Sequence, residues 1–464
     1  MGLGIGVKAT GRNQTSGAKK RLVQLGIDVP LLLILITFLI FGILMVYSAS
    51  WDFSLAIYDS ATYIFERQLL WIAIGIVVAT GAAFFDYHRW KRLAVPAMLI
   101  TILGLSAVLI VSEIRLNAAR SLFQGSFQPS ELAKIVMIIY LAVWLDSKRE
   151  HLHDVSFGLL PLAGILGFVG GLIFLQPDLS AVLTIIALGG LLFFLAGGDL
   201  KQIVLLLVVA AVVGWLVVAV SPTGQIRVAS YLDGVRDPTS ASYHVRRSLE
   251  AFVKGGWFGV GIGKADTKLT GLPVPPTDSI YAVIGEETGV LGALGVVLMY
   301  GALLWRGLKI SHCAPDTLGA LLAGGLTLWI VMEAFINMAV MVGLAPFAGN
   351  ALPLISAGGS NMVVTMLAMG VILNVSRLGA QAEEEAPSHV SPVLDFRSRK
   401  TAYYAKTVPT ATLKPDAVPE KTARRRRPMA SHPSLFRSNP FRSNPFRPRN
   451  RERIPREGSD GEGE

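Results

Sequence analysis

The sequence predicts an all-α polytopic membrane protein with about ten transmembrane helices, a large external loop between spans 7 and 8, and a disordered cytoplasmic tail. Of its 464 residues, 52% are hydrophobic and only 16% are charged, whereas an ordinary soluble domain has about 25% charged residues. The apolar residues also come in runs of roughly 17–25, the length that a helix needs to cross a bilayer. The composition therefore excludes a purely water-soluble enzyme.

Apolar runs between charged or turn-forming breaks give ten predicted spans. The first span is not a cleavable signal peptide, because no small-residue cleavage site follows it. The chain divides into an N-terminal cytoplasmic arm at 1–27, a membrane domain at 28–378 and a tail at 379–464. The predicted spans are 29–47, 69–85, 93–111, 132–145, 157–175, 179–196, 203–220, 279–304, 318–341 and 361–376.

Lysine and arginine in short loops predict the orientation of the spans, because cytoplasmic loops carry an excess of them. The N-terminal arm and alternate loops are basic, whereas the opposite short loops hold only Arg67, Arg115 and Arg120. We therefore expect both termini to be cytoplasmic and the loop at 221–278 to be external. This external loop is itself basic, which either reflects a ligand or follows from the tolerance of long loops to charge. Its basic residues are Arg227, Arg236, Arg246, Arg247, Lys254, Lys264 and Lys268.

The predicted tail differs in composition from the membrane domain. It holds 17 Lys/Arg against 11 Asp/Glu, with four arginines at 424–427 and the repeat Phe-Arg-Ser-Asn-Pro at 436–440 and 441–445. Such a segment cannot bury a core, which predicts disorder. We expect it to lie on anionic membrane lipids or to dock a partner. Nucleic-acid binding is disfavoured, because no folded nucleic-acid-binding module accompanies the charge.

Several kinds of chemistry lack the residues that they need. The single cysteine, Cys313, excludes a disulfide framework, a Cys-ligated zinc site and an iron–sulfur cluster. The seven histidines include no pair at i,i+4 within a predicted helix. Neither a Walker A pattern nor a Rossmann fingerprint occurs, so we expect no nucleotide or redox cofactor.

Ionisable residues at membrane depth are costly and are functional candidates by default. All of them except Glu333 fall at or near the external ends of predicted spans, so we expect their chemistry to face outward. These residues are Arg120, Glu131, Lys134, Asp178, Asp278, Glu286, Glu287 and Glu333.

Asp278 follows the proline-rich stretch 272–277, directly before the eighth span. Two interpretations fit this position. An Asp directly before a helix is a typical N-cap, and the helix dipole favours its charge. A carboxylate held rigidly at a membrane surface can instead act as a general base toward a hydroxyl.

Three further motifs carry weaker evidence. Adjacent Glu286 and Glu287 point about 100° apart on a helix, so one can face a cavity while the other pairs within the bundle. Structural pairing of these glutamates with Arg or Lys is the alternative interpretation. Proline in the motifs at 128–131 and 176–178 is typical of a helix start. The small residues at 357–360 permit close helix approach or a broken helix.

The order and spacing of these motifs resemble the SEDS family (shape, elongation, division and sporulation), the FtsW/RodA-type polytopic glycosyltransferases. The resemblance covers about 28–377, including the ten spans and the large external loop. Six motifs carry it, in order along the chain: Gln128-Pro-Ser-Glu-Leu-Ala-Lys134, Gln176-Pro-Asp-Leu, Arg247-Ser-Leu-Glu-Ala, Leu272-Pro to Thr277-Asp278, Ile284-Gly-Glu-Glu-Thr-Gly289 and Pro353-Leu-Ile-Ser-Ala-Gly-Gly-Ser360.

This resemblance implies the SEDS fold and polymerisation of lipid II into peptidoglycan glycan strands on the outer face of the bacterial cytoplasmic membrane. The essential aspartate of the family falls on Asp278, as general base or through a divalent cation, Mg²⁺ or Mn²⁺, that activates the acceptor hydroxyl. The leaving diphosphate needs positive charge. Lys134 matches a substrate-contacting position of the family. The expected substrate-binding residues are Arg120, Lys134, Glu131, Arg246, Arg247, Lys264, Lys268, Glu286, Glu287 and Ser360.

The chain departs from the family pattern beside the aspartate. Pro276 and Ser279 stand where the family usually has histidine and phenylalanine, which removes a potential proton acceptor. The motif versions look nearer to FtsW than to RodA, which implies a role in cell division and a class B penicillin-binding protein as partner. The tail is a hypothetical docking site for division proteins. A flippase or transporter of lipid-linked sugar, suggested by Glu333, and a catalytically degenerate scaffold remain as alternatives.

Overall fold

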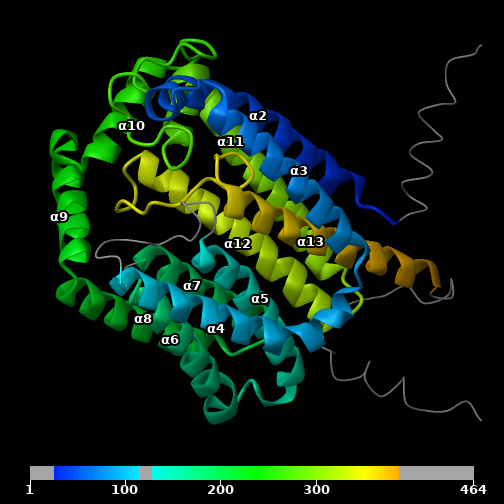
Figure 1. The fold of residues 1–464 in the computed structure, drawn as a ribbon. Coiled ribbons are helices and arrows are strands. Elements are labelled where there is room, and N and C mark those ends of the chain that lie inside the picture. Colours follow the sequence, from blue (N-terminus) through cyan, green and yellow to red (C-terminus); the bar gives the residue numbers. More distant parts are fainter. Residues whose placement is uncertain (1–25, 115–127, 177, 386–464) are drawn as a thin grey trace, which may run out of the picture. The chain divides into compact units, whose positions relative to one another are not determined.

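A computed structural model describes residues 26–114, 128–176 and 178–385, and the regular structure in these ranges is helical (Figure 1). Short helical turns lie at Tyr87–Arg89, Arg149–His151, Val155–Leu159 and Pro238–Ser240. The α-helices are α2 (Val29–Tyr58), α3 (Tyr63–Phe84), α4 (Trp90–Ile114), α5 (Pro129–Ser147), α6 (Leu160–Phe174), α7 (Leu179–Leu195), α8 (Leu200–Val220), α9 (Pro222–Arg236), α10 (Tyr243–Gly255), α11 (Ile280–His312), α12 (Thr317–Met341) and α13 (Gly359–Glu385).

Each of the ten predicted spans coincides with one of the helices α2–α8 and α11–α13. Within the described ranges, eight helices are long and apolar enough to cross a membrane. The two others are α5, whose 19 residues include Glu131, Lys134 and Asp146, and α7, which has 17 residues. The multi-pass architecture is thus confirmed, and the count of ten spans stays a prediction.

The first helix is longer than the apolar run that predicted it. Helix α2 continues from the predicted end at residue 47 to Tyr58. Ser48, Ser50 and Ser54 interrupt the apolar run, yet their side chains are buried. A small hydroxyl side chain is tolerated inside a helical bundle when it finds a hydrogen-bond partner, as Ser48 and Ser54 do.

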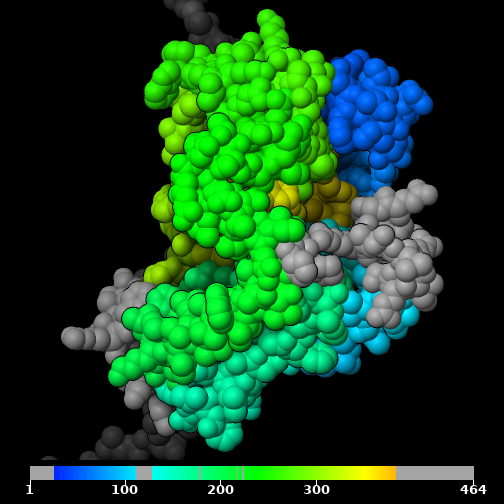
Figure 2. All heavy atoms as spheres, turned by 90° about the vertical axis from the view of Figure 1, so that its left-hand side faces the viewer, coloured from blue at the N-terminus to red at the C-terminus, as the bar shows by residue number. Residues whose placement is uncertain are grey.

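The predicted external loop contains two helices, α9 and α10. Helix α10 is amphipathic and buries Val245, Ser248, Ala251 and Gly255, which recur every three or four residues. Helix α10 packs against α11 and also contacts α12, where the Ser248 hydroxyl bonds Met341. In Figure 2 the surface is hollowed between the green region that includes α10 and the green helices of residues 200–236, and residues of the later, yellow-to-gold part of the chain are visible in the hollow.

Helices α12 and α13 form the most enclosed part of the bundle. In their most apolar windows 72% and 67% of the residues are buried, against 12% in α8. Helix α12 packs against α11, α5 and α7, and α13 packs against α3 and α12 (Figure 1). Side chains on α12 therefore reach several neighbouring helices at once.

The span predicted at 279–304 consists of two helical segments joined at Gly289, where φ is +71°. The backbone groups freed by this break pair with residues 255–263, here called the glycine segment. The Val290 N–H donates to the Gly256 carbonyl at 2.9 Å, and the Gly261 N–H donates to the Glu287 carbonyl at 3.0 Å. A Cβ at Gly289 would lie 2.4 Å from a backbone oxygen of the glycine segment, so only glycine fits.

Candidate active site

Backbone hydrogen bonds hold the residues that lead to Asp278. The Pro276 carbonyl accepts from the Ala357 N–H at 2.8 Å. The Thr277 carbonyl accepts from the Ser356 hydroxyl, also at 2.8 Å. The segment that precedes α13 therefore fixes the path of the chain into α11.

The segment at 350–358 is itself tightly held. The Ser356 hydroxyl accepts from the Leu352 N–H at 2.7 Å. Gln68 of α3 donates from its amide to the Ser356 carbonyl at 3.2 Å and accepts from the Gly358 N–H at 3.2 Å. Leu354 has φ +66°, a conformation that costs energy for a residue other than glycine and that clusters at functional sites.

Asn337 of α12 joins the two segments. Its buried side-chain amide donates to the Asp278 carbonyl at 2.9 Å and to the Asn350 carbonyl at 2.5 Å. Asn337 and Gln68 were not among the predicted site residues, because only ionisable groups were considered at membrane depth. An uncharged amide inside an apolar helix is also costly to bury, and this would have identified both residues.

The backbone of Asp278 is fixed by hydrogen bonds, whereas its carboxyl remains available to bind a substrate or accept a proton. The side chain is partly buried, and a Cβ built on Gly349 would lie 3.1 Å from its Oδ2 atom. Burial raises the pKa of Asp278 above its ordinary value, a hydrogen bond from Thr277 opposes the rise, and the nearby charge of Glu131 adds to it. No ion pair with a described basic residue lowers this pKa. A partly buried carboxyl with a raised pKa is typical of catalytic groups.

The helix-cap interpretation of Asp278 is wrong. Ser279 occupies the N-cap position of α11, and no side chain caps that helix end. The Asp278 carboxylate is thus not used to cap the helix that follows it.

Beside Asp278 lies a buried charge cluster that joins α5, α12 and α13. The Lys134 ammonium donates to Glu131 at 2.9 Å and also to Glu333. The second oxygen of Glu131 accepts from the Asn361 amide at 3.0 Å. Glu333 is therefore the ion-pair partner of Lys134 rather than a separate polar site within the membrane.

Asp178 ties two helix ends together. Its Oδ1 atom accepts from the Ala181 N–H at 3.2 Å and caps α7. Its Oδ2 atom accepts from Ser130 at 3.2 Å and from Gln128 at 3.3 Å. The expected helix starts at 128–131 and 176–178 are confirmed for α5 and α7.

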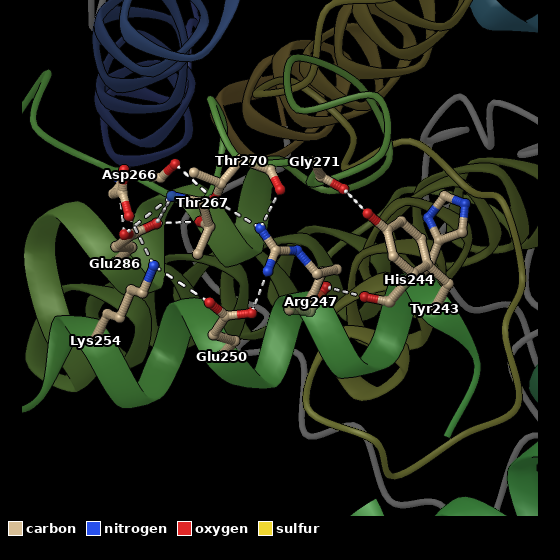
Figure 3. A network of polar contacts seen from close by, with 11 residues as sticks. Tyr243, His244, Arg247, Glu250, Lys254, Asp266, Thr267, Thr270, Gly271 and Glu286 are labelled. Atoms are coloured by element: carbon tan, nitrogen blue, oxygen red, sulfur yellow. Dashed lines mark hydrogen bonds and ion pairs between the residues drawn. The ribbon is translucent and has the colours of Figure 1, made fainter. Parts of the chain in front are cut away.

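Figure 3 shows a polar network between α10 and the turn that follows the glycine segment. Glu286 accepts from the Asp266 N–H at 2.9 Å, from the Thr267 N–H at 3.2 Å and from the Thr267 hydroxyl. Arg247 donates to the Thr270 carbonyl at 2.5 Å and to Glu250. The network fixes the 264–271 turn over α11.

Glu287 makes a second buried connection. It forms an ion pair with Lys268 at 3.0 Å and accepts from the Ser48 hydroxyl of α2 at 2.5 Å. The side chains of Lys268 and Glu287 are 5% and 0% exposed. The structure favours the structural interpretation of the two adjacent glutamates, because the external loop folds back and pairs with both.

The other predicted substrate-binding residues are spread over the described chain. Arg246 and Lys264 are exposed. The Ser360 hydroxyl accepts from the Gln128 N–H at 3.4 Å, which places the start of α13 beside the start of α5. Arg120 lies outside the described residues.

The residues beside Asp278 do not fit a metal site built by the protein alone. Over the described ranges no group of three His, Cys, Asp or Glu side chains comes together in a way that could hold a metal ion. Glu131, the acidic residue whose charge acts on Asp278, is already bonded to Lys134 and Asn361. The divalent cation therefore stays a prediction, and no step below depends on it.

Comparison with known proteins agrees with this architecture. The family model described as "Cell cycle protein" (FtsW/RodA/SpoVE) matches residues 29–381. A probable peptidoglycan glycosyltransferase FtsW of Trichlorobacter lovleyi is 36% identical over 75% of this chain and 93% of its own length. The stage V sporulation protein E of Bacillus subtilis is 36% identical over 75% of this chain and 96% of its own length.

Solved structures share the fold. A structure described as "Structural coordination of polymerization and crosslinking by a peptidoglycan synthase complex" matches with TM-score 0.61 and 24% identity, over 76% of this chain and 99% of that chain. The rod shape determining protein RodA of Thermus thermophilus matches with TM-score 0.54 and 22% identity, over 76% of this chain and 97% of that chain. By the match of its whole membrane domain, this chain belongs to the FtsW/RodA/SpoVE family.

Proposed function

We propose that this chain is an inverting peptidoglycan glycosyltransferase that polymerises lipid II, with Asp278 as the general base. The observation that carries the proposal is a carboxyl whose own backbone is fixed by Asn337 while its oxygens form no ion pair within the described residues. The names of the curated relatives supply the reaction class.

In the proposed reaction, Asp278 accepts the proton of the acceptor sugar's 4-hydroxyl. The hydroxyl oxygen forms a bond to C1 of the donor sugar, and the bond from C1 to the diphosphate oxygen breaks with inversion. The undecaprenyl diphosphate leaves with that electron pair. A raised pKa suits this role, because a stronger base is better matched to a hydroxyl.

Pro276 provides no substitute for the histidine that the family usually has there. It has no side-chain acceptor, and its carbonyl already accepts from Ala357. Proton removal in this chain is therefore assigned to Asp278 alone.

We place the protein in the bacterial cytoplasmic membrane with both termini in the cytoplasm, on the charge of the short loops. The FtsW names among the relatives support a role in cell division. A class B penicillin-binding protein is the proposed partner, supported by the likeness to a chain of a peptidoglycan synthase complex. Binding of lipids or division proteins by the tail rests on its composition, since 386–464 lies outside the described residues.

The transporter alternative loses the feature that suggested it. Glu333 is paired with Lys134 in the cluster beside Asp278, so it does not mark a second polar site at mid-membrane. The scaffold alternative is separated from the enzyme by the following experiment.

The test is polymerisation of labelled lipid II by purified full-length protein, with and without its cognate class B penicillin-binding protein. The native chain should form polymer and Asp278→Asn should not. Asp266→Asn is the matched control, since this external carboxylate is 60% exposed and pairs with Lys254 at the surface. No polymer from the native chain with its partner present would overturn the enzyme in favour of a scaffold.

A further inference from the structure

Two aromatic side chains outside the active site are unusually exposed. Trp257 and Phe258 of the glycine segment are 69% and 83% exposed, and Val253, one turn earlier on α10, is 82% exposed. Neither the proposed reaction nor the polar network of Figure 3 uses them. A cluster of exposed apolar side chains marks an interaction surface.

The second segment of α11 shows how deep this surface lies. The Trp257 carbonyl accepts from the Leu291 N–H at 3.3 Å, so Trp257 lies at the start of that segment. Arg306, near its other end, pairs with Asp28, the N-cap of α2. From 291 to 306 the helix rises about 22 Å, which approaches the hydrocarbon thickness of about 30 Å. If Arg306 marks one membrane boundary, Trp257 lies close to the other.

Helix α2 gives the same level independently. From Asp28 to Ser48 it rises about 30 Å. Ser48 donates to Glu287, two residues before the break in α11. Both helices therefore place the glycine segment at the membrane boundary on the Asp278 side.

The surface continues into a lipid-facing stripe on α11. Leu291, Leu294, Leu298 and Trp305 are 50%, 49%, 65% and 65% exposed, and their spacing puts them on one face of the helix. Trp305 at the cytoplasmic end lies against Lys309, whose ammonium is 5.7 Å from the ring centroid. Aromatic residues at both ends of an apolar stripe are typical of the two interfacial belts of a membrane protein.

We propose that Trp257 and Phe258 insert into the interfacial layer of the bilayer on the Asp278 side and hold the glycine segment at that level. The occupant of this surface is lipid, because the exposed aromatics are continuous with the lipid-facing stripe of α11. The glycine segment pairs with the break at Gly289, so this anchor sets the height of the helix that begins beside Asp278. The proposal rests on the membrane architecture and not on the transfer reaction.

The test uses the single cysteine of the chain. In a Cys313→Ser background, a nitroxide spin label is placed at Phe258→Cys and, as a second site, at Val253→Cys. Leu294→Cys is the lipid reference, and Arg246→Cys, exposed two turns earlier on α10, is the aqueous reference. The full chain alone is reconstituted in vesicles of phosphatidylethanolamine and phosphatidylglycerol, and collision with oxygen is compared with collision with a water-soluble nickel chelate.

We expect the oxygen-to-nickel collision ratio at Phe258→Cys to be several-fold higher than at Arg246→Cys and close to that at Leu294→Cys. A ratio equal to that at Arg246→Cys would overturn the proposal. Shielding from both reagents would also overturn it, in favour of contact with a second copy. Exposure to nickel that is lost only when the class B penicillin-binding protein is added would overturn it in favour of a partner-binding surface.

Discussion

The acidic residues near the start of α11 differ in how many partners bind their carboxylates: Glu286 and Glu287 form one group, and Asp278 stands alone. Glu286 and Glu287 are buried. The external loop supplies two backbone N–H groups and the Thr267 hydroxyl to Glu286, and it supplies Lys268 to one oxygen of Glu287. At Asp278, Asn337 binds the backbone carbonyl, and the carboxyl forms no ion pair within the described residues.

This difference suggests a structural role for Glu286 and Glu287 and a catalytic role for Asp278. A buried charge that is paired across two segments holds those parts of a chain together, and removal of one partner leaves the other uncompensated. Ionising a carboxyl that has few partners and a raised pKa lowers the stability of the fold. Proteins tolerate this loss at functional sites. The following experiments test whether the two groups differ in this way.

The largest effect is expected from Asp278→Asn. Loss of the general base should lower polymerisation by about 10²-fold or more. Thermal unfolding should occur at the same or a higher temperature, because a neutral amide replaces a carboxyl that is costly to ionise. Gel analysis of labelled glycan strands and a thermal melt measure the two quantities. A large loss of stability would place Asp278 with the structural carboxylates.

Glu287→Ala should, in contrast, strongly lower the stability of the fold. It leaves the Lys268 ammonium buried without its carboxylate, and breaking such a pair costs about 3–5 kcal/mol. Glu250→Ala is the control, because this residue is 38% exposed and its ion pairs lie at the surface. Such pairs contribute about 0–1 kcal/mol.

A double variant sharpens this measurement. Replacing both members of the pair, Glu287→Leu with Lys268→Met, should destabilise less than Glu287→Ala alone, since no unpaired charge remains. Thermal melts in one detergent compare the variants. Equal losses for Glu287→Ala and Glu250→Ala would contradict the assigned structural role.

The glycine segment allows a test of the docking that surrounds Glu287. A Cβ at Gly259 would lie 2.2 Å from the Glu287 carbonyl oxygen, whereas a Cβ at Gly263 would meet no atom within 4 Å. Both residues have positive φ, +79° and +83°. Alanine should therefore cost about 1–2 kcal/mol at Gly263 from backbone conformation, and more at Gly259 from the added clash. Equal melting temperatures for the two alanine variants would show that the segment is not docked on α11.

The smallest effect expected is in the pH profile. The base must be ionised, so polymerisation by the native chain should rise with pH through a pKa above the ordinary 3.8 of an aspartate. Because the folded-state pKa is raised, the native chain should lose stability as pH rises through that value. Asp278→Asn should lack this loss. A rate that rises through an ordinary or lowered pKa would contradict burial of the carboxyl.

Much of the fold and one residue of the candidate site could be predicted from the sequence. The ten apolar runs correspond to ten helices because each helix must cover itself with apolar side chains at membrane depth. Asp278 was identified because a charge beside a span is costly and conspicuous. Asn337 and Gln68 were missed because they are uncharged. The roles of Glu286 and Glu287 stayed undecided because Ser48, a partner of Glu287, lies 239 residues away in sequence.

The sequence by itself determined that this chain is a multi-pass helical membrane protein, and its motifs pointed to the family and to Asp278. Hydropathy and local spacing carry that information, since they act within one span or one turn. Only the tertiary structure decided which carboxylates are bound by partners inside the folded protein. That outcome depends on where the external loop folds back, because a buried charge is stabilised by whichever donors the fold brings within hydrogen-bond distance.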